Sequence, residues 1–162
     1  RNEKVSAGAD TVNKYRNPLE AAKIMLKLKK EDYEKILDHC RKGLPNESCG
    51  LLGGTIEGDV KTIEKVYLLT NIDESNEHFS MDPKEQLSAI KDIRHNGYQM
   101  IGSFHSHPES PSRPSEEDKR LAFDPNIEYL ILSLMDAENP VLKAFGVDKE
   151  KNVTVHELQI TE

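Results

Sequence analysis

Hydrophobic residues recur along this chain either three to four residues apart or in short runs. The wider spacing, together with helix-capping residues, predicts three helices. In the first helix, which closes at Gly43, apolar residues share one face at positions i, i+3, i+4 and i+7: Tyr33, Ile36, Leu37 and Cys40. A second helix is predicted between Asp82 and Asn96, because a capping residue is followed by a first-turn proline and a capping-box acid. Ser115, with three acids after it, begins a short third helix that ends at Asp124.

Shorter apolar runs between polar turns predict strands. The predicted strands span residues 24–28, 49–54, 60–69, 98–104, 127–135, 141–147 and 153–160. The second is expected to end at the pair Gly53 and Gly54, and the run 127–135 is apolar enough to be covered on both faces. Short polar turns join the last three strands, which predicts an antiparallel meander with His156 on its polar face and without a role.

The order of these elements predicts an α/β fold. Helices alternate with strands early in the chain and strands cluster late, as in a mixed β-sheet flanked by helices. At 162 residues the chain has the length of one domain. Residues 1–17 are polar without a hydrophobic period, so they are expected to form a flexible lead or linker, and the folded domain is predicted to span residues 18–162.

The stretch SFHSHPESPSRPSEED, residues 103–118, contains the residues with the clearest chemistry. His105 and His107 are two apart at the end of an apolar strand, so their side chains share a face. The proline-rich segment that follows must return the chain as a loop, and the helix begun by Ser115 then brings Asp118 within reach of the two imidazoles. Two histidines and one carboxylate form a three-ligand site for a divalent metal, with a position left for water.

Each of these residues also has a purely structural interpretation. A single histidine on a strand is usually a surface residue or one with its hydrogen bonds satisfied. Ser115 and Asp118 fit a helix N-terminus without any metal, as the cap and as an acid that favours the helix dipole. The combination of two histidines on one face with both helix residues favours the metal site.

This combination of residues is similar to a known signature. His105, Ser106, His107 and Pro108, followed after a loop by Ser115 and Asp118, resemble the motif of the JAMM metalloproteases, the metal-binding branch of the MPN superfamily. That family also has an upstream glutamate, which Glu47 in NESCGLLGG matches. The resemblance covers nearly the whole chain. It implies a mixed, curved β-sheet with helices at its sides, the architecture of cytidine deaminases, with the metal at one edge.

The resemblance implies zinc-dependent hydrolysis of an amide bond at the C-terminal diglycine of a ubiquitin-like or sulfur-carrier protein. One Zn²⁺ per chain would be held by His105, His107 and Asp118. Glu47 is predicted to be the general acid/base that moves a proton from water to the leaving amine, and Ser115 to hydrogen-bond the developing oxyanion. The extended substrate tail is expected to add as a strand to an exposed sheet edge.

Alternative functions make different demands on the sequence. A non-catalytic MPN scaffold that only binds partners would be expected to lack a metal ligand or the glutamate, and none is missing. A zinc deaminase would need an HxE motif and a PCxxC pair, which the chain lacks. Cys49 is disfavoured as a nucleophile, because its position in a strand suits a small buried side chain.

Composition narrows the partners and the compartment. A formal net charge of −7 disfavours nucleic acid, which would require a basic surface. No apolar run is long enough to span a bilayer and no signal-peptide pattern is present, so no membrane partner is expected. Cys40 and Cys49 cannot form a disulfide framework, which predicts a reducing, cytoplasmic setting.

Overall fold

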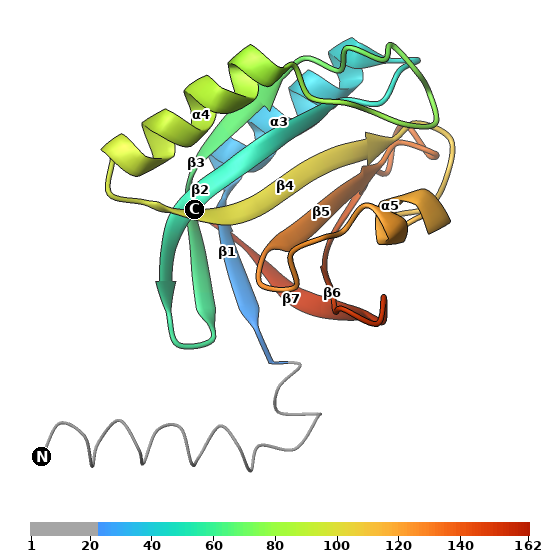
Figure 1. Cartoon of the computed structure of the whole chain (residues 1–162). Helices are drawn as coiled ribbons and strands as arrows, with labels where there is room; N and C mark the ends of the chain where they lie inside the picture. Colours follow the sequence, from blue (N-terminus) through green and yellow to red (C-terminus); the bar gives the residue numbers. More distant parts are fainter. Residues whose placement is uncertain (1–22) are drawn as a thin grey trace, which may run out of the picture.

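A computed structural model describes residues 23–162, so the predicted lead over residues 1–17 and the predicted domain boundary at residue 18 lie outside the described part of the chain. Within residues 23–162 there are seven strands and three helices (Figure 1). In chain order these are β1 (Met25–Lys29), α3 (Lys30–Gly43), β2 (Cys49–Glu57), β3 (Val60–Leu69), α4 (Pro83–His95), β4 (Gln99–His107), α5 (Glu116–Arg120), β5 (Glu128–Ser133), β6 (Val141–Val147) and β7 (Val153–Thr161).

The seven strands form a closed barrel in the order β1-β3-β2-β4-β5-β6-β7. The short strand β1 closes it, because β1 pairs in parallel with β3 on one side and with β7 on the other. The mixed α/β class predicted from the sequence is confirmed, and so is the antiparallel meander of β5, β6 and β7. The predicted sheet flanked by helices differs from the structure in one detail. The described strands close into a barrel, so both edges of the sheet are paired.

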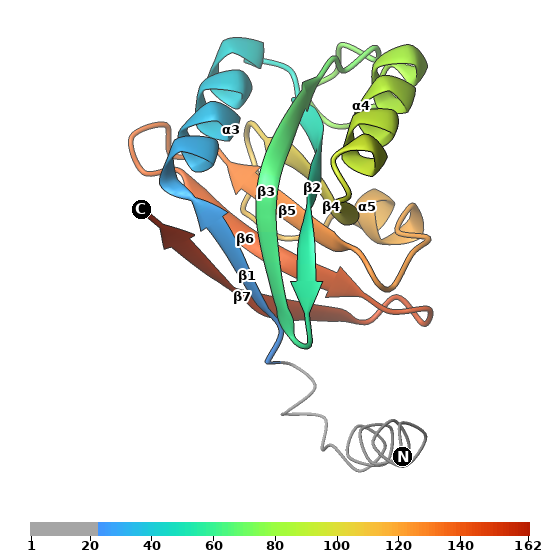
Figure 2. The same cartoon turned by 90° about the vertical axis from the view of Figure 1, so that its left-hand side faces the viewer.

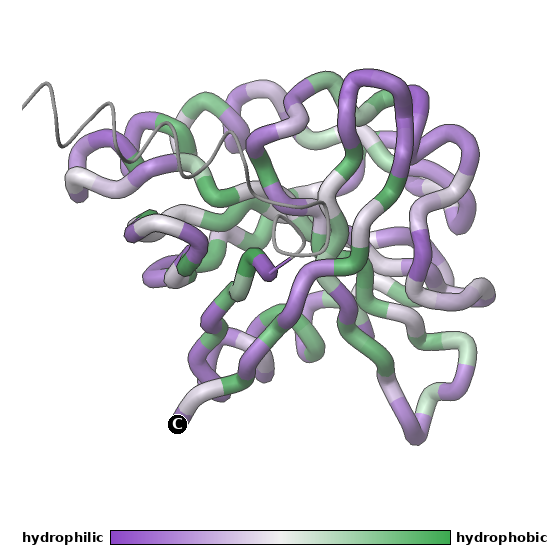
Figure 3. The backbone as a smooth tube through the Cα atoms, turned by 90° about the horizontal axis from the view of Figure 1, so that it is seen from below, coloured by the Kyte–Doolittle hydropathy of each residue, from purple (hydrophilic) through white to green (hydrophobic). Residues whose placement is uncertain are grey.

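Two helices lie on different sides of β2 and β3, as Figure 2 shows. Helix α3 contributes Ile36 and Cys40 to the main core, where they pack against inward-facing strand residues such as Leu52 and Phe104. Helix α4 instead covers the outer face of the barrel, where Ala89 belongs to a second, smaller apolar cluster. Figure 3 shows the hydrophobic segments gathered toward the middle of the molecule and the hydrophilic ones along its outer loops.

Strand β2 runs through the two glycines that were predicted to end it, and it continues to Glu57 with a bulge between Gly53 and Gly54. The reason is close packing of neighbouring backbones. A Cβ atom on Gly54 would lie 1.9 Å from the carbonyl oxygen of Thr62 on β3. Glycine at this position therefore permits the strands to approach each other, and it does not mark a turn.

A buried polar cluster joins three strands inside the barrel. Glu128 is only 1% exposed, and its carboxylate accepts hydrogen bonds from Lys61 Nζ at 2.7 Å and from His156 Nδ1 at 2.5 Å. The prediction that His156 lies on a polar face without a role is therefore wrong. On β7 the valines face outward, with Val155 60% exposed, and the histidine points inward to the carboxylate of β5.

Two expectations about membranes and cysteines can be compared with the described residues. Among residues 23–162, no helix combines the length and the apolar character needed to cross a bilayer. Cys40 and Cys49 are both free thiols and both are buried, as predicted for core positions. Burial raises the pKa of each thiol to about 12, so neither is a ready nucleophile.

Candidate metal centre

The two histidines of the predicted metal site are the seventh and last residues of β4, so the strand extends three residues beyond its predicted end. It is held there by pairing on both sides, with Cys49 of β2 opposite His105 and Ser133 of β5 opposite His107. Both imidazoles are buried, with 3% and 4% of their surface exposed. Because the residues alternate along the strand, the two rings lie on the outer face of the barrel, while Phe104 packs into the core.

The loop between β4 and α5 is fastened to β5 at two points. Ser112 Oγ donates to the carbonyl oxygen of Ile131, and Ser133 Oγ donates to that of Ser110, each at 2.6 Å. The loop therefore returns the chain along β5, as its prolines predicted. Helix α5 begins where the return ends, and this placement sets the distance between its first turn and the histidines.

Helix α5 is short, and its first turn positions the carboxylate of Asp118. Ser115 is the N-cap, and its hydroxyl accepts from Asp118 N at 3.0 Å while Asp118 Oδ2 accepts from Ser115 N at 2.9 Å. This capping box fixes the carboxylate rotamer. The helix ends at Arg120, before the predicted end at Asp124.

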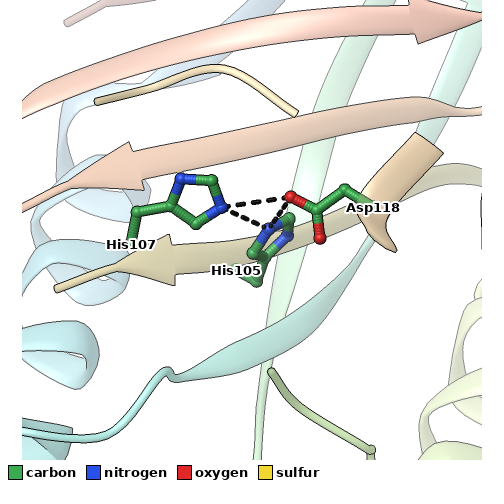
Figure 4. Close-up of side chains that lie close together, drawn as sticks. All are labelled: His105, His107 and Asp118. Atoms are coloured by element: carbon green, nitrogen blue, oxygen red, sulfur yellow. Dashed lines mark hydrogen bonds and ion pairs between the residues drawn. The ribbon is translucent and has the colours of Figure 1, made fainter. Parts of the chain in front are cut away.

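Three ligand atoms converge where the strand and the helix meet (Figure 4). His105 Nε2 and His107 Nε2 are 3.2 Å apart, and each lies 3.1 Å from Asp118 Oδ2. A tetrahedral zinc site with bonds of about 2.0–2.2 Å has edges between ligand atoms of roughly 3.3–3.6 Å. The observed triangle is close to one face of such a tetrahedron, so these residues fit a divalent metal.

Neighbouring groups orient the two rings. His107 Nδ1 lies 2.9 Å from the carbonyl oxygen of Pro111, and donation to this acceptor leaves the lone pair of Nε2 directed at the centre of the triangle. The ring of Phe79 stacks on His105, with ring centroids 4.7 Å apart and planes inclined by 27°. Both histidines are thus held in ligand orientation without a metal.

The electrostatics of the triangle favour an ionised carboxylate. Burial raises the pKa of Asp118, but hydrogen bonds from His105 and His107 outweigh it and hold that pKa well below its usual range. For His107, burial lowers the pKa, and the bonds to Asp118 and to the Pro111 carbonyl raise it by more. Metal binding by these residues requires the imidazole nitrogens in their unprotonated form, so the affinity for a cation is expected to depend on pH.

Glu47, two residues before β2, is near enough to the triangle for the charges of His107 and Asp118 to shift its pKa. Its side chain is 5% exposed, and Oε1 has no hydrogen-bond partner within the described part of the chain. Burial raises the pKa of Glu47 to about 8, while the nearby His107 lowers it and Asp118 raises it. A buried carboxyl group with a free oxygen next to a metal triangle is a candidate proton acceptor.

Ser106 is a functional neighbour that the sequence analysis did not single out. It lies between the two histidines and points to the opposite, inner face, where its hydroxyl accepts from Ser48 N at 2.8 Å. Its own N–H donates to Ser48 O at 3.0 Å. Ser106 therefore links β4, the strand of the two histidines, to Ser48, which follows Glu47 in the chain.

A cavity of about 320 Å³ opens beside the triangle, and sequence reasoning did not find it. Its lining combines His105 and Asp118 of the triangle with apolar side chains that come from four separate segments: Phe79, Met81, Leu121, Phe123, Ile131 and Val147. Phe79 lies in the connection between the predicted strand 60–69 and the predicted helix after Asp82, and its phenyl ring among mostly polar residues is the signal that could have marked it.

Comparisons with known proteins extend the similarity to most of the chain. Residues 29–146 match a family described as prokaryotic homologs of the JAB domain. A desampylase of Haloferax volcanii is 34% identical over 113 residues, which cover 67% of this chain and 80% of the relative. The CysO-cysteine peptidase of Mycobacterium tuberculosis is 28% identical over 109 residues, which cover 67% of this chain and 73% of the relative.

Solved structures agree with the fold. The solution structure of protein DSY2949 from Desulfitobacterium hafniense is 54% identical, with a TM-score of 0.78 over 85% of this chain and 94% of that one. The crystal structure of AF2198, a JAB1/MPN domain protein from Archaeoglobus fulgidus, is 23% identical, with a TM-score of 0.54 over 85% of this chain and 99% of that one. At this identity the second likeness concerns the fold alone.

A barrel with two histidines and a carboxylate converging on its outer face has the build of a metallohydrolase. The family match covers well over half of the residues, and the chain belongs to the prokaryotic branch of the JAB, or JAMM, hydrolases. The resemblance predicted from the HSHP and SxxD motifs is thus confirmed, as is the enzyme class, since the named relatives are hydrolases.

Proposed function

We propose that this chain is a zinc metallopeptidase that hydrolyses an amide bond at the C-terminal diglycine of a ubiquitin-like or sulfur-carrier protein. The observation that carries the proposal is the triangle of His105, His107 and Asp118 beside the buried, unpartnered carboxyl oxygen of Glu47. Relatives named desampylase and CysO-cysteine peptidase support a conjugated carrier protein as substrate. The cytoplasmic setting stays a prediction.

The chemistry is divided between the metal and the side chains. His105, His107 and Asp118 would hold zinc, which would supply Lewis acidity for the scissile carbonyl and the attacking water. Glu47 would accept a proton from the attacking water through its free carboxyl oxygen and pass it to the leaving amine. Such general acid/base catalysis contributes about a hundred- to ten-thousand-fold in rate.

Ser115 is proposed to stabilise the oxyanion. Its hydroxyl accepts a hydrogen bond from Asp118 N, which leaves the O–H itself available to donate, and its residue is exposed toward solvent. A donor placed at a developing oxyanion contributes roughly 3 kcal/mol. The same serine therefore caps the helix and has one donor left for catalysis.

The cavity beside the triangle is the proposed seat of the substrate tail. The expectation that the tail adds to an exposed sheet edge does not hold for the described strands, because each of them has neighbours on both sides. The cavity instead lies next to His105 and offers apolar walls that include Phe123, which is 80% exposed. An extended diglycine tail could enter it with its final amide at the metal.

The decisive experiment compares Glu47→Gln with the wild type. The variant is expected to bind zinc within threefold of the wild-type affinity and to cleave a peptide-Gly-Gly amide at least a hundredfold more slowly. Glu138→Gln, at an exposed position away from the site, is the matched control and should behave as the wild type. Full activity of Glu47→Gln would refute the general-base role, and a zinc-bound wild type without hydrolysis would favour the non-catalytic scaffold.

A further inference from the structure

The main chain of Glu47 is held by the segment of residues 70–82, which connects β3 to α4. Its N–H donates to the carbonyl oxygen of Ser75 at 2.7 Å. Its carbonyl oxygen accepts from Asn71 Nδ2 at 3.0 Å. The next residue, Ser48, is held from the other side by Ser106 of β4. The position of Glu47 relative to the metal triangle therefore depends on both the connecting segment and the metal strand.

Asn71 uses the full hydrogen-bonding capacity of its side chain. Its Nδ2 donates to the carbonyl oxygens of Glu47 and of His78, the second at 3.1 Å. Its Oδ1 accepts from Asp73 N at 3.0 Å and from Ser80 N at 3.1 Å. An amide side chain has two donor hydrogens and two acceptor lone pairs, and all four are engaged.

Two of these partners flank the aromatic ring of the site. His78 and Ser80 stand on either side of Phe79, whose ring stacks on His105. One amide group thus contacts the main chain of the proposed general base and the main chain on both sides of the ring that covers a metal ligand. No other side chain type of this size carries two donors and two acceptors.

Hydrogen bonds join the two ends of the connecting segment, so residues 70–82 form a closed loop. Asn71 lies where the two ends meet. Ile72 N donates to Ser80 O at 3.0 Å, and Asp82 N donates to Thr70 O at 3.2 Å. Glu85 of α4 accepts from Thr70 N at 2.7 Å and from Thr70 Oγ1 at 2.9 Å. Glu85 was predicted as a capping-box acid, and its carboxylate instead fastens the loop to the helix.

We propose that Asn71 is a positioning residue that fixes Glu47 and Phe79 relative to the metal ligands through one side chain. Its catalytic consequence rests on the proposed function, but its structural consequence does not. The metal ligands come from β4 and α5 and contact Asn71 through none of its four hydrogen bonds. Loss of the amide should therefore disturb catalysis and the ring of Phe79 while zinc binding persists.

The test uses Asn71→Ala and Asn71→Asp with three readouts. The first is the NMR shift of the His105 ring protons, which the stacked Phe79 ring moves from their ordinary values, as Phe79→Leu will calibrate. The second is zinc affinity by chelator competition. The third is kcat and KM on a peptide-Gly-Gly-aminomethylcoumarin amide. Asn71→Asp can keep both acceptor bonds, while its second carboxylate oxygen replaces the donor group and repels the carbonyl oxygens of Glu47 and His78, so it serves if the alanine variant fails to fold.

Both variants should lose most of the Phe79-induced shift at His105, bind zinc within threefold of the wild type, and lower kcat by ten- to a hundredfold. KM should rise as well, because Phe79 lines the cavity proposed for the substrate tail. The control is Asn96→Ala, which removes two side-chain hydrogen bonds at the end of α4, from Asn96 Nδ2 to Asp92 O at 2.7 Å and to Asp92 Oδ2 at 3.1 Å. It should change none of the three readouts.

The outcomes separate this inference from the proposed function. Wild-type His105 shifts and kcat in both Asn71 variants would overturn the positioning role. A parallel loss of zinc binding and kcat would also overturn it, because it would show a general collapse of the site. If the wild type neither binds zinc nor cleaves the amide, while the variants still lose the His105 shift, the proposed function fails and the positioning of Phe79 by Asn71 stands.

Discussion

At the scale of single residues, Asp118 belongs to two structures at once. Its Oδ2 accepts from the N–H of Ser115 to complete the helix cap, and the same oxygen faces both imidazoles at 3.1 Å. Because the cap fixes the rotamer, the carboxylate reaches the triangle without an additional ordering cost. The structural and metal-binding interpretations of this residue, which the sequence offered as alternatives, therefore hold together geometrically.

Replacing Asp118 by asparagine separates the two roles. An amide oxygen can still accept from Ser115 N, so the helix should persist, but the negative charge is lost from the triangle. We expect zinc affinity to fall at least a hundredfold, and the metal-free protein to lose some stability at neutral pH, because the ionised carboxylate that the fold favours is gone. Chelator competition and urea unfolding measure both. Glu116→Gln, in the same first turn but exposed, is the control.

Glu47 gives a prediction for pH in the metal-free protein. Burial raises its pKa from 4.5 to about 8, so between these values the unfolded chain has lost the proton that the folded protein keeps. This contribution of Glu47 to stability therefore declines as pH rises through that window. Glu47→Gln cannot titrate, and it should be as stable as the wild type at about pH 4 and more stable by about 1–3 kcal/mol at pH 8.

Urea unfolding of both proteins across this range tests the prediction. Effects of groups that do not interact with Glu47 cancel in the difference between the two curves, and His107, whose pKa Glu47 raises, is the coupled group that remains. A difference that stays constant from pH 4 to pH 8 would show that Glu47 titrates normally in the fold, and its burial would then not prepare it to accept a proton.

At the scale of elements, local periodicity predicted most strands and helices but not their partners. The helix α3 and the strands β3, β6 and β7 lie close to their predicted spans, because each has its own hydrophobic face. Barrel closure depends on β1 pairing with β3 and with β7, whose residues are far away in sequence. No pattern within a strand encodes that choice, so the closed barrel could not be predicted.

The residues of the proposed metal site were predictable to different degrees. His105, His107 and Asp118 were predictable because one strand and one helix cap, adjacent in sequence, bring them together. Glu47 entered only through the family resemblance, since it lies 58 residues before His105. Asn71 and Phe79 were missed, because a loop without periodicity gives no sign of what its side chains contact.

The inward side chain of His156 was predicted incorrectly because strand alternation gave the core face to the valines of β7. His156 instead points inward, because the buried carboxylate of Glu128 needs hydrogen-bond partners. Lys61 and His156 supply them from the two other strands of the cluster. Glu128→Ala would leave a buried ammonium without its partner, and we expect a loss of about 3–5 kcal/mol in the free energy of unfolding.

Urea unfolding of zinc-free Glu128→Ala measures this loss. The exposed Glu150→Ala serves as control. A loss below about 1 kcal/mol in Glu128→Ala would mean that the cluster is hydrated and contributes little, as surface ion pairs do.

At the scale of the whole molecule, the metal triangle and the main core are separate. The core lies inside the barrel and includes residues such as Leu26, Ile63 and Leu130, while the triangle lies on the outer face. The metal is therefore expected to serve catalysis and not folding. Removal of zinc by a chelator should leave the far-UV circular dichroism unchanged and the unfolding cooperative, unlike the loss of a structural zinc. Loss of secondary structure on chelation would contradict this separation.

The measurement that tests the central claim most directly is the zinc K-edge X-ray absorption spectrum of protein loaded with one equivalent of Zn²⁺. We predict scattering from two imidazoles and light oxygen neighbours at about 2.0–2.2 Å, lost in His105→Ala and in His107→Ala. Sulfur scattering at about 2.3 Å, or a spectrum that neither substitution changes, would place the ion elsewhere and contradict the account.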